Sequence, residues 1–431
     1  MIFNESIYNK HWNTKKLNEL GTFNRGKSKH RPRNDLKLFK NGIYPFIQTG
    51  DIKNSILYIS SHTQNYNEFG LAQSKLWNKG TLCITIASNI ADTAVLAYPM
   101  CFPDSVVGFI ANPTESSEIF MHYIFTYIQK YIQNSVIGSI QDNINIDYLQ
   151  NLEFKIPSKE YQEKITFILS SIDKKIELNN KINSELENMA KTIYDYWFLQ
   201  FEFPNDEGKP YKSSGGKMVW NEELKKEIPD GWKLISIKEC IQHIKTGLNP
   251  RNNFKLGTGN IKYITVKNLT TSGNINFSNC DLIDEEARII VNNRSEIKKG
   301  DILFASIAPL GRCFIIQENP KDWDINESVF TIRPNYDKIS SEFLYMFFMS
   351  EYFIKKAEAS STGSIFSGIR INTIGNMKIL IPDKKIIDSF TDKVNNLFYN
   401  KFKNNQESQE LISLRDYLLP LLMNGQVGFK D

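Results

Sequence analysis

Residues 156–197 read IPSKEYQEKITFILSSIDKKIELNNKINSELENMAKTIYDYW, and residues 381–422 read IPDKKIIDSFTDKVNNLFYNKFKNNQESQELISLRDYLLPLL. Each stretch opens with Ile-Pro and a good helix N-cap residue, Ser158 or Asp383, whose side-chain oxygen can accept from free backbone N–H groups. Apolar residues then recur at helical spacing, with Lys, Glu, Asp and Asn between them. Roughly 40 residues at 1.5 Å each make about 60 Å, so each stretch predicts one unusually long helix.

The apolar stripe of each predicted helix is broken by an asparagine at the same place. Positions 165, 172, 179, 186 and 193 read Ile, Ile, Asn, Leu, Ile, and positions 390, 397, 404, 411 and 418 read Phe, Leu, Asn, Leu, Leu. Two equivalent helices can bury their stripes by packing antiparallel about a local two-fold axis. That packing brings Asn179 and Asn404 into or near one layer, where a polar pair fixes the register. The alternative is that each helix packs separately on its own domain.

The composition narrows the class of protein. A chain of 431 residues with 41% hydrophobic residues can build two to four domains, and a formal charge of +4 means that any polyanion must be met by local patches. The five cysteines have neither zinc nor CxxC spacing, and their odd number argues against a disulfide framework. No signal core and no apolar run of 18 residues is present. We expect a cytoplasmic protein without a membrane span.

The second half of the chain is a copy of the first. Pro32-Arg33-Asn34 recurs as Pro250-Arg251-Asn252, and Lys79-Gly80-Thr81-Leu82 recurs as Lys299-Gly300-Asp301-Ile302. Residues Phe46 to Ile52, which we interpret as a short strand, correspond to Tyr263 to Leu269. Gly138-Ser139-Ile140 corresponds to Gly363-Ser364-Ile365. The offset between matching segments drifts only from 217 to 225 residues, so the ordered series is not chance.

Each half therefore predicts an α+β arrangement: a mixed domain of short strands and helices, followed by a long helix. Helical segments are expected around residues 119–132 and 343–357. Pro420 should kink or end the second long helix, and Asn424-Gly425 is a plausible stop. The predicted boundaries are a first domain at residues 1–155, a long helix at 156–200, a linker at 201–231, a second domain at 232–380 and a second long helix at 381–431.

The first loop of each domain carries the best functional signal. Basic and amide side chains crowd a short Gly- and Pro-containing stretch in both halves. Arg and Lys neutralise phosphates, whereas Arg, Asn and Gln read base edges through paired donors and acceptors. A single charged loop is more often merely solvated, but its repetition favours contact with DNA. The candidates are Arg25, Lys27, Lys29, His30, Arg31, Arg33 and Asn34 in the first half, and Lys245, Arg251, Asn252, Asn253 and Lys255 in the second.

Further candidates follow the first loops. Gln48, Thr49, Lys267 and Asn268 lie on or after the next strand, where they could also contact DNA. Ser139 and Ser364 lie in small-residue loops that would allow close approach to a phosphate backbone or could equally be tight turns.

Motifs for catalysis are missing. The chain has no Asn-Pro-Pro-Tyr-like loop for a flipped adenine, no Walker A sequence, no Gly-x-Ser-x-Gly elbow and no convincing nuclease carboxylate set. The five histidines form no ligand spacing, so we expect no metal site and no catalysis by this chain alone.

At this point the pattern resembles a known family, the specificity subunit of Type I restriction–modification systems. The segments that carry the resemblance are residues 201–216, from Phe201-Glu202-Phe203-Pro204 to Ser214-Gly215-Gly216, then Trp220-Asn221-Glu222-Glu223-Leu224, and then Ile228-Pro229-Asp230-Gly231-Trp232. The resemblance covers essentially the whole chain. It implies two target recognition domains held apart by an antiparallel coiled coil, with an internal pseudo-two-fold repeat.

The resemblance also implies partners. Double-stranded DNA would be read as a bipartite, asymmetric target, and two methylation subunits would dock on the coil and the adjoining domains. Restriction–translocase subunits would join later, with one copy of this chain in the complex. S-adenosylmethionine, ATP and Mg²⁺ would be bound by those partners, and this chain would hold no cofactor. Alternatives are a stand-alone DNA-binding regulator, a nuclease or methyltransferase with an unrecognised site, and a structural adaptor.

Overall fold

The computed structural model describes residues 6, 8–137, 144, 146–360 and 368–429. The chain divides into two compact units, of which only unit 2 is one continuous segment. Unit 1 comprises Met1–Asn180 with Gln406–Asp431, and unit 2 comprises Lys181–Asn405. The division therefore falls within both long helices. Among the described residues, no helix has the length and apolarity needed to cross a membrane.

Unit 1 contains eleven strands among its described residues, with short helices between them and one long helix packed on a sheet. The helix α4 (Glu118–Ile137) packs against β7 and β8, and α6 (Lys159–Tyr194) starts in this unit. The strands are β1 (Asn13–Lys16), β2 (Gly21–Arg25), β3 (Tyr44–Phe46), β4 (Tyr58–Ile59), β5 (Gln64–Tyr66), β6 (Leu76–Trp77), β7 (Leu82–Thr85), β8 (Thr93–Leu96), β9 (Met100–Cys101), β10 (Val106–Ala111) and β11 (Glu153–Ile156). The short helices are α1 (Leu17–Leu20), α2 (Thr49–Lys53), α3 (Glu68–Ala72) and α5 (Ile146–Gln150), with a 3-10 turn at Leu36–Leu38.

Unit 2 repeats this order and ends in α12 (Lys384–Met423), which continues into unit 1. Its strands are β12 (Met218–Asn221), β13 (Lys226–Pro229), β14 (Lys233–Ser236), β15 (Ile241–Thr246), β16 (Ile261–Ile264), β17 (Asp281–Ile283), β18 (Ile302–Ala305), β19 (Cys313–Ile315), β20 (Trp323–Ile325), β21 (Val329–Pro334) and β22 (Lys378–Ile381). Its other helices are α7 (Ile237–Cys240), α8 (Glu285–Ser295), α9 (Ser341–Met349), α10 (Glu351–Ser360) and α11 (Ile371–Asn376).

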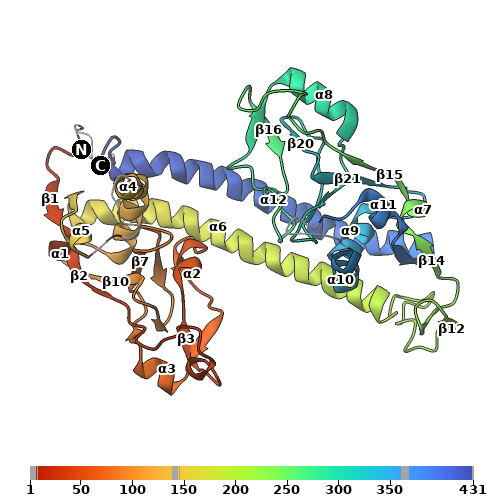
Figure 1. Ribbon diagram of the computed structural model, residues 1–431, viewed down its shortest axis with the longest axis horizontal. Helices are drawn as coiled ribbons and strands as arrows, with labels where there is room; N and C mark the ends of the chain where they lie inside the picture. Colours follow the sequence, from red (N-terminus) through yellow and green to blue (C-terminus); the bar gives the residue numbers. More distant parts are fainter. Residues whose placement is uncertain (1–5, 7, 138–143, 145, 361–367, 430–431) are drawn as a thin grey trace. The chain divides into compact units, whose positions relative to one another are not determined.

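The sheets confirm the internal repeat and the α+β class (Figure 1). The first sheet runs β2-β10-β7-β8-β4 in unit 1 and β15-β21-β18-β19 in unit 2. The second runs β5-β3-β9-β6 in unit 1 and β17-β16-β20 in unit 2, and each contains one parallel pair, β3 with β9 and β16 with β20. In each unit a two-stranded antiparallel ribbon, β1 with β11 or β14 with β22, joins the start of the domain to the strand before the long helix. In each unit the first strand of the domain therefore pairs with its last strand, directly before the long helix begins.

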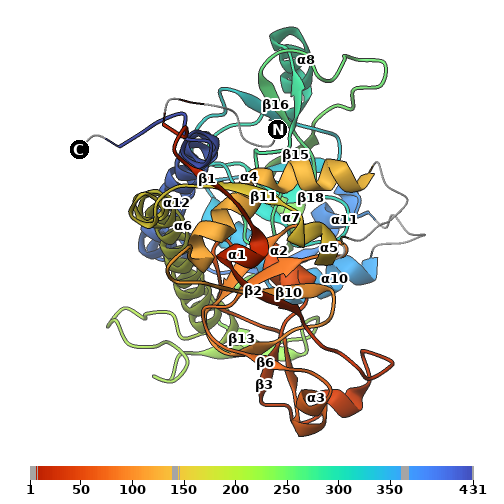
Figure 2. The same cartoon turned by 90° about the vertical axis from the view of Figure 1, so that its left-hand side faces the viewer.

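The two long helices pack against each other, and within each unit they run antiparallel and side by side (Figures 1 and 2). In unit 1, Asn179 Nδ2 donates to Ser408 Oγ (3.2 Å), and in unit 2, Asn404 Nδ2 donates to Asn183 Oδ1 (3.0 Å). An offset of 225 residues maps Asn179 onto Asn404 and Asn183 onto Ser408. The same pair of equivalent positions is therefore in contact in each unit. The antiparallel pairing is thus confirmed, and both asparagines lie in it. Their role in fixing the register stays a prediction.

One layer of the helix pair is ionic in unit 1 and apolar in unit 2. Asp173, only 1% exposed, accepts from Arg415 Nη1 (3.1 Å) and from Tyr123 Oη (2.6 Å). The positions equivalent to Asp173 and Arg415 in unit 2 are Phe398 and Ala190, both members of its apolar core.

Another layer shows the reverse exchange. In unit 2, Lys401 Nζ lies 3.3 Å from Glu187 Oε2 and donates to the Ser272 carbonyl (2.6 Å). In unit 1 the position equivalent to Lys401 is Ile176, and the position equivalent to Glu187 is Ile412. In both ionic layers the acid belongs to α6 and the base to α12, so the two internal copies are not interchangeable.

Two predicted elements need correction. The strand expected over residues 46–52 ends at Phe46, because Asp51 accepts from the Gln48 backbone N–H (2.7 Å) and starts α2. The expected helix over 343–357 is split at Ser350, whose hydroxyl caps α10. The predicted linker contains the β12–β13 hairpin and buried Phe203, stacked 4.5 Å from Tyr211.

The end of α12 agrees with the sequence only in part. The helix continues through Pro420 to Met423, so the proline does not end it. The chain then stops at Gly425, which has a φ of 59°, and Gln426 N–H donates to the Leu421 carbonyl (2.8 Å). The predicted stop at Asn424-Gly425 is confirmed.

The ionic layer of unit 1 gives a stability prediction. Replacing Asp173 with alanine leaves the partly buried Arg415 with only the exposed Asp416 as a carboxylate partner, which should lower the free energy of unfolding by about 3 kcal/mol. The double variant Asp173→Ala, Arg415→Ala should cost less than the sum of the two single changes. Chemical denaturation of the full chain measures this. Lys164→Ala, which breaks an exposed pair with Glu160, is the control and should change the free energy by about 0.5 kcal/mol or less. Equal losses in Asp173→Ala and Lys164→Ala would contradict the assignment.

Candidate nucleic-acid interface

Most of the predicted DNA-contacting residues lie in the loop after β2 (residues 26–43) and the loop after β15 (residues 247–260). Each loop starts at a glycine that touches the backbone between two further strands. A Cβ on Gly26 would lie 2.3 Å from the Pro103 carbonyl oxygen, and one on Gly247 would lie 1.7 Å from that of Ile325. Only glycine allows this approach, so the two loops leave their sheets at matched points.

In unit 2 the β20–β21 connection (residues 326–328) gathers three loops. Gly247 N–H donates to the Asn326 carbonyl (3.2 Å), and Asn326 N–H donates to the Ile264 carbonyl at the end of β16 (2.8 Å). Ser306, which starts the loop after β18, donates its N–H to the Ser328 carbonyl (3.0 Å). Residues 247–260, 265–269 and 306–311 therefore meet at one edge, which we call the loop edge of unit 2.

Unit 1 builds its loop edge in the same way, around the β9–β10 connection (residues 102–105). Gly26 N–H donates to the carbonyl of Val106, the first residue of β10 (2.8 Å), and Ile47 N–H donates to the Cys101 carbonyl (3.0 Å). Ile86 N–H donates to the Ser105 carbonyl (3.0 Å). The loop edge of unit 1 thus joins residues 26–43, the start of α2 and residues 86–91.

The first loop of unit 1 presents its basic side chains to solvent. Arg33 Nη2 lies 2.7 Å from one Asp104 oxygen, and Arg31 Nη2 lies 3.7 Å from the other. Both arginines remain about half exposed, so one carboxylate steadies them and leaves other N–H groups free to donate. His30 Nε2 contacts Asp35 (2.8 Å) and belongs to the loop's own framework. Arg25, Lys27, Lys29 and Asn34 are also exposed.

The first loop of unit 2 is similar but less tied down. Arg251, Asn252, Asn253 and Lys255 are exposed, and Asn253 Nδ2 donates to the Asn249 carbonyl (2.9 Å). Within the described part of the chain, Arg251 makes no hydrogen bond or ion pair. Its five N–H donors are therefore available to a ligand.

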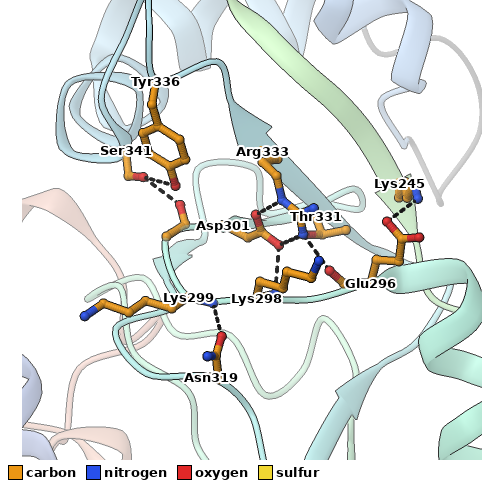
Figure 3. A network of polar contacts seen from close by, with 11 residues as sticks. Lys245, Glu296, Lys298, Lys299, Asp301, Asn319, Thr331, Arg333, Tyr336 and Ser341 are labelled. Atoms are coloured by element: carbon orange, nitrogen blue, oxygen red, sulfur yellow. Dashed lines mark hydrogen bonds and ion pairs between the residues drawn. The ribbon is translucent and has the colours of Figure 1, made fainter.

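Lys245 has a different place from its predicted neighbours. Its ammonium lies 2.6 Å from Glu296, which ends α8 in a left-handed conformation with a φ of 46° (Figure 3). The lysine holds the pKa of Glu296 below its ordinary value. Lys245 therefore ties β15 to the end of α8, and we leave it out of the interface.

A buried ion pair beside it shapes the strand that feeds the loop edge (Figure 3). Arg333 donates from Nε and Nη2 to the two oxygens of Asp301, each at 2.7 Å, and Asp301 is fully buried. Asp301 also accepts from the Lys298 backbone N–H (2.9 Å), and Arg333 Nη2 donates to the Glu296 carbonyl (2.6 Å). This bidentate pair fixes the turn that precedes β18. The loop of residues 306–311 follows directly after the other end of that strand.

The four candidates that follow the first loops separate into two kinds. Lys267 is exposed in the turn after β16, and Gln48 is exposed at the start of α2, where it donates to Gln64 (2.8 Å). Thr49 is the half-buried first residue of α2. Asn268 is only 5% exposed, its Oδ1 accepts from Thr265, and its Nδ2 donates to the Asn276 carbonyl (3.1 Å). Both ends of that amide are used to close the turn, so we remove Asn268 from the proposed interface.

Two predicted residues cannot be placed, and two loops were missed. Ser139 and Ser364 lie outside the described residues. Residues 86–91 and 306–311 reach the loop edges, and Ser88, Ala308 and Pro309 in them are exposed. Their signal was weak because the loops are small and lack charge, although both follow an apolar strand at equivalent positions.

The chemistry of both edges suits a polyanion. Exposed guanidinium, ammonium and amide groups gather there, and among the described residues no group of three or more His, Cys, Asp or Glu side chains could hold a metal ion. The arrangement can bind phosphates and donate to base edges.

Comparison with known proteins agrees with this geometry. A family model described as the Type I restriction modification DNA specificity domain matches residues 9–188 and again residues 229–412. The chain is 27% identical over 433 residues to the Type I restriction enzyme MjaIX specificity subunit of Methanocaldococcus jannaschii, covering 98% of this chain and 95% of that protein. It is 23% identical over 456 residues to the HindI specificity subunit of Haemophilus influenzae, covering 92% and 97%.

A solved structure shares the fold. The crystal structure of the Type-I restriction-modification system S subunit from M. genitalium matches with a TM-score of 0.59 and 16% sequence identity, and the match covers 100% of both chains.

The matched glycines give a prediction for the loop edges. Gly247→Ala should force the first loop away from the β20–β21 connection and lower the free energy of unfolding by about 1–3 kcal/mol, because the new Cβ meets backbone rather than a flexible side chain. Gly50→Ala is the control, since its Cβ would meet nothing within 4 Å. Chemical denaturation of both variants is the measurement. A Gly247→Ala protein as stable as Gly50→Ala would contradict the close approach.

Proposed function

The chain belongs to the Type I restriction modification DNA specificity family, and on that premise we propose that it reads a bipartite, asymmetric DNA target, one half-site per unit. Specificity subunits recognise DNA sequence and are not themselves catalytic. The observation that carries the proposal is the loop edge, built twice by backbone hydrogen bonds between corresponding segments and lined with different side chains in the two units. Two similar scaffolds with unlike loops imply two unlike half-sites.

The exposed residues suggest a division of labour. Arg251 and Asn252 in unit 2, and Arg33 and Asn34 in unit 1, present donor and acceptor groups that match base edges. Phosphate contacts would then fix the position of each domain on the duplex without reading sequence. The lysines suited to them are Lys27, Lys29, Lys255 and Lys267.

The long helices suit a spacer between the two half-sites. The helices α6 and α12 contain 36 and 40 residues, or about 54 Å and 60 Å at 1.5 Å per residue. Each begins in one unit and ends in the other. A continuous antiparallel pair would hold two readers at a set distance along the DNA and leave an unread gap of defined length.

The internal repeat suits two copies of one partner. Met189 in unit 2 and Leu414 in unit 1 are equivalent positions on the helices, and they are 52% and 45% exposed. Apolar side chains exposed at matched places would offer the same contact to each partner copy, and Met is enriched in protein interfaces. We assign Met189 and Leu414 as docking contacts for two methylation subunits. Restriction–translocase subunits would join the same complex, which would contain one copy of this chain. S-adenosylmethionine, ATP and Mg²⁺ would be held by those partners.

The base-reading role of Arg251 is directly testable. In the complex with its methylation subunits, Arg251→Ala should weaken binding about tenfold for targets with an intact second half-site, because a bidentate contact to a base is lost. Recognition of the first half-site should not change. Binding to duplexes with single-base substitutions measures both. Lys233→Ala removes an exposed cation of unit 2 on β14, away from the loop edge, and should have little effect; equal losses at both half-sites in Arg251→Ala would contradict the assignment.

The spacer role has its own test. Inserting seven residues after Asn180 and seven after Asn405 adds two helical turns to each helix, about 10.5 Å. At about 3.4 Å per base pair, the tolerated gap should lengthen by about three base pairs. Mapping methylated sites in a host that carries the extended chain gives the gap directly. An unchanged gap would refute the spacer, and an insertion in only one helix is the control that should disrupt pairing.

A further inference from the structure

Arg312 joins two loops of the loop edge of unit 2 through backbone carbonyls. It lies just before β19, and its guanidinium donates from all three nitrogens. Nη1 donates to Val266 (2.6 Å) and Leu269 (3.4 Å), Nη2 to Ile307 (3.3 Å) and Ala308 (3.4 Å), and Nε to Pro309 (3.1 Å). Five N–H groups in a rigid plane can satisfy such a spread of acceptors, which no other side chain can do.

The two loops that it joins differ in chemistry. The turn at residues 265–269 presents the exposed ammonium of Lys267, and Arg312 bonds to carbonyls on both sides of that residue. The loop at residues 306–311 presents Ala308 and Pro309, both exposed. The backbones of the two loops, one with a cation and one with an apolar tip, are thereby tied to one guanidinium. On DNA, an ammonium suits a phosphate or a base acceptor, and an apolar tip suits a thymine methyl group.

We propose that Arg312 is a positioning residue for the second half-site: it locks residues 265–269 and 306–311 into one composite reading surface, with Lys267 and the Ala308-Pro309 tip as its contacts to DNA. This rests on the proposed function of the chain. Arg312 itself contributes shape rather than contact, because its donors already face protein carbonyls.

Unit 1 lacks this device. The residue equivalent to Arg312 is Asp92, whose Oδ1 accepts from Gln129 Nε2 (2.5 Å). Residues 86–91 are closed by Thr85, which accepts the Ala91 N–H at its carbonyl (2.9 Å) and the Asp92 N–H at its hydroxyl (3.0 Å). The loop of unit 1 is therefore closed on itself. A substitution of Arg312 should therefore impair recognition of the second half-site only.

The test compares Arg312→Lys, Arg312→Ala and Lys267→Ala in the complex with the methylation subunits. Arg312→Lys keeps the charge, but a single ammonium cannot bridge five carbonyls in two loops. It should lower discrimination between correct and single-base-substituted second half-sites about tenfold and leave first half-site discrimination unchanged. Lys267→Ala should weaken binding and, where the ammonium meets a phosphate, reduce the salt dependence by about one ion. Lys233→Ala is the control for lost charge.

The outcomes separate the possible failures. A purely structural role predicts a lower melting temperature and equal losses at both half-sites in Arg312→Lys, and that result overturns the proposal. Unchanged discrimination in Arg312→Lys and Arg312→Ala also overturns it. If the unmodified complex reads one continuous site, or binds DNA without sequence preference, the proposed function itself fails. If Arg312→Ala does not fold, Arg312→Lys and Lys267→Ala decide the question.

Discussion

The antiparallel pairing of α6 with α12 is the constraint on which the rest depends. Each helix extends beyond the unit in which it begins, so the end of α12 completes the core of unit 1 and the end of α6 completes the core of unit 2. Leu419, Leu422 and Met423 belong to the core that contains Ile165 and Leu169 of unit 1. Unit 1 is therefore complete only after its last 26 residues have been added to a segment that ends at Asn180. Truncating the C-terminus would expose the core of the first domain.

The two ionic layers of this pairing break the internal symmetry in a consistent way. Asp173 and Glu187 lie on α6, whereas Arg415 and Lys401 lie on α12. If α6 paired with a second α6 in the same register, those acids would face Ala190 and Ile176, and charges would be buried without partners, which is strongly unfavourable. A second α12 would bury the two cations against Phe398 and Ile412. Pairing within the chain is thereby preferred over pairing of like helices, although the two copies share their apolar stripe.

Recognition is separated from this framework by the way in which the loops leave the sheets. Backbone hydrogen bonds at residues 101–106 and 326–328 gather the loops, and they depend little on side-chain identity. Side chains in the loops can then vary without disturbing the scaffold. Where a side chain does set loop shape, as with Arg312 or the Asp301–Arg333 pair, it acts in one unit only. The same scaffold can thus present two unlike surfaces.

The sequence by itself determined the long helices, the repeat and the position of the first loops, because these depend on local periodicity, capping and residues repeated at a nearly constant offset. Ser158 precedes α6, and Gly425 ends α12, as local chemistry requires. Tertiary structure alone decided which polar residues are free. In the sequence, Lys245 and Asn268 are candidates for DNA contact in the same way as Arg251. In the structure, Lys245 forms an ion pair with Glu296, and the amide of Asn268 closes a turn. Arg312 and residues 306–311 reach the loop edge only through contacts between segments distant in the chain, which no local pattern records.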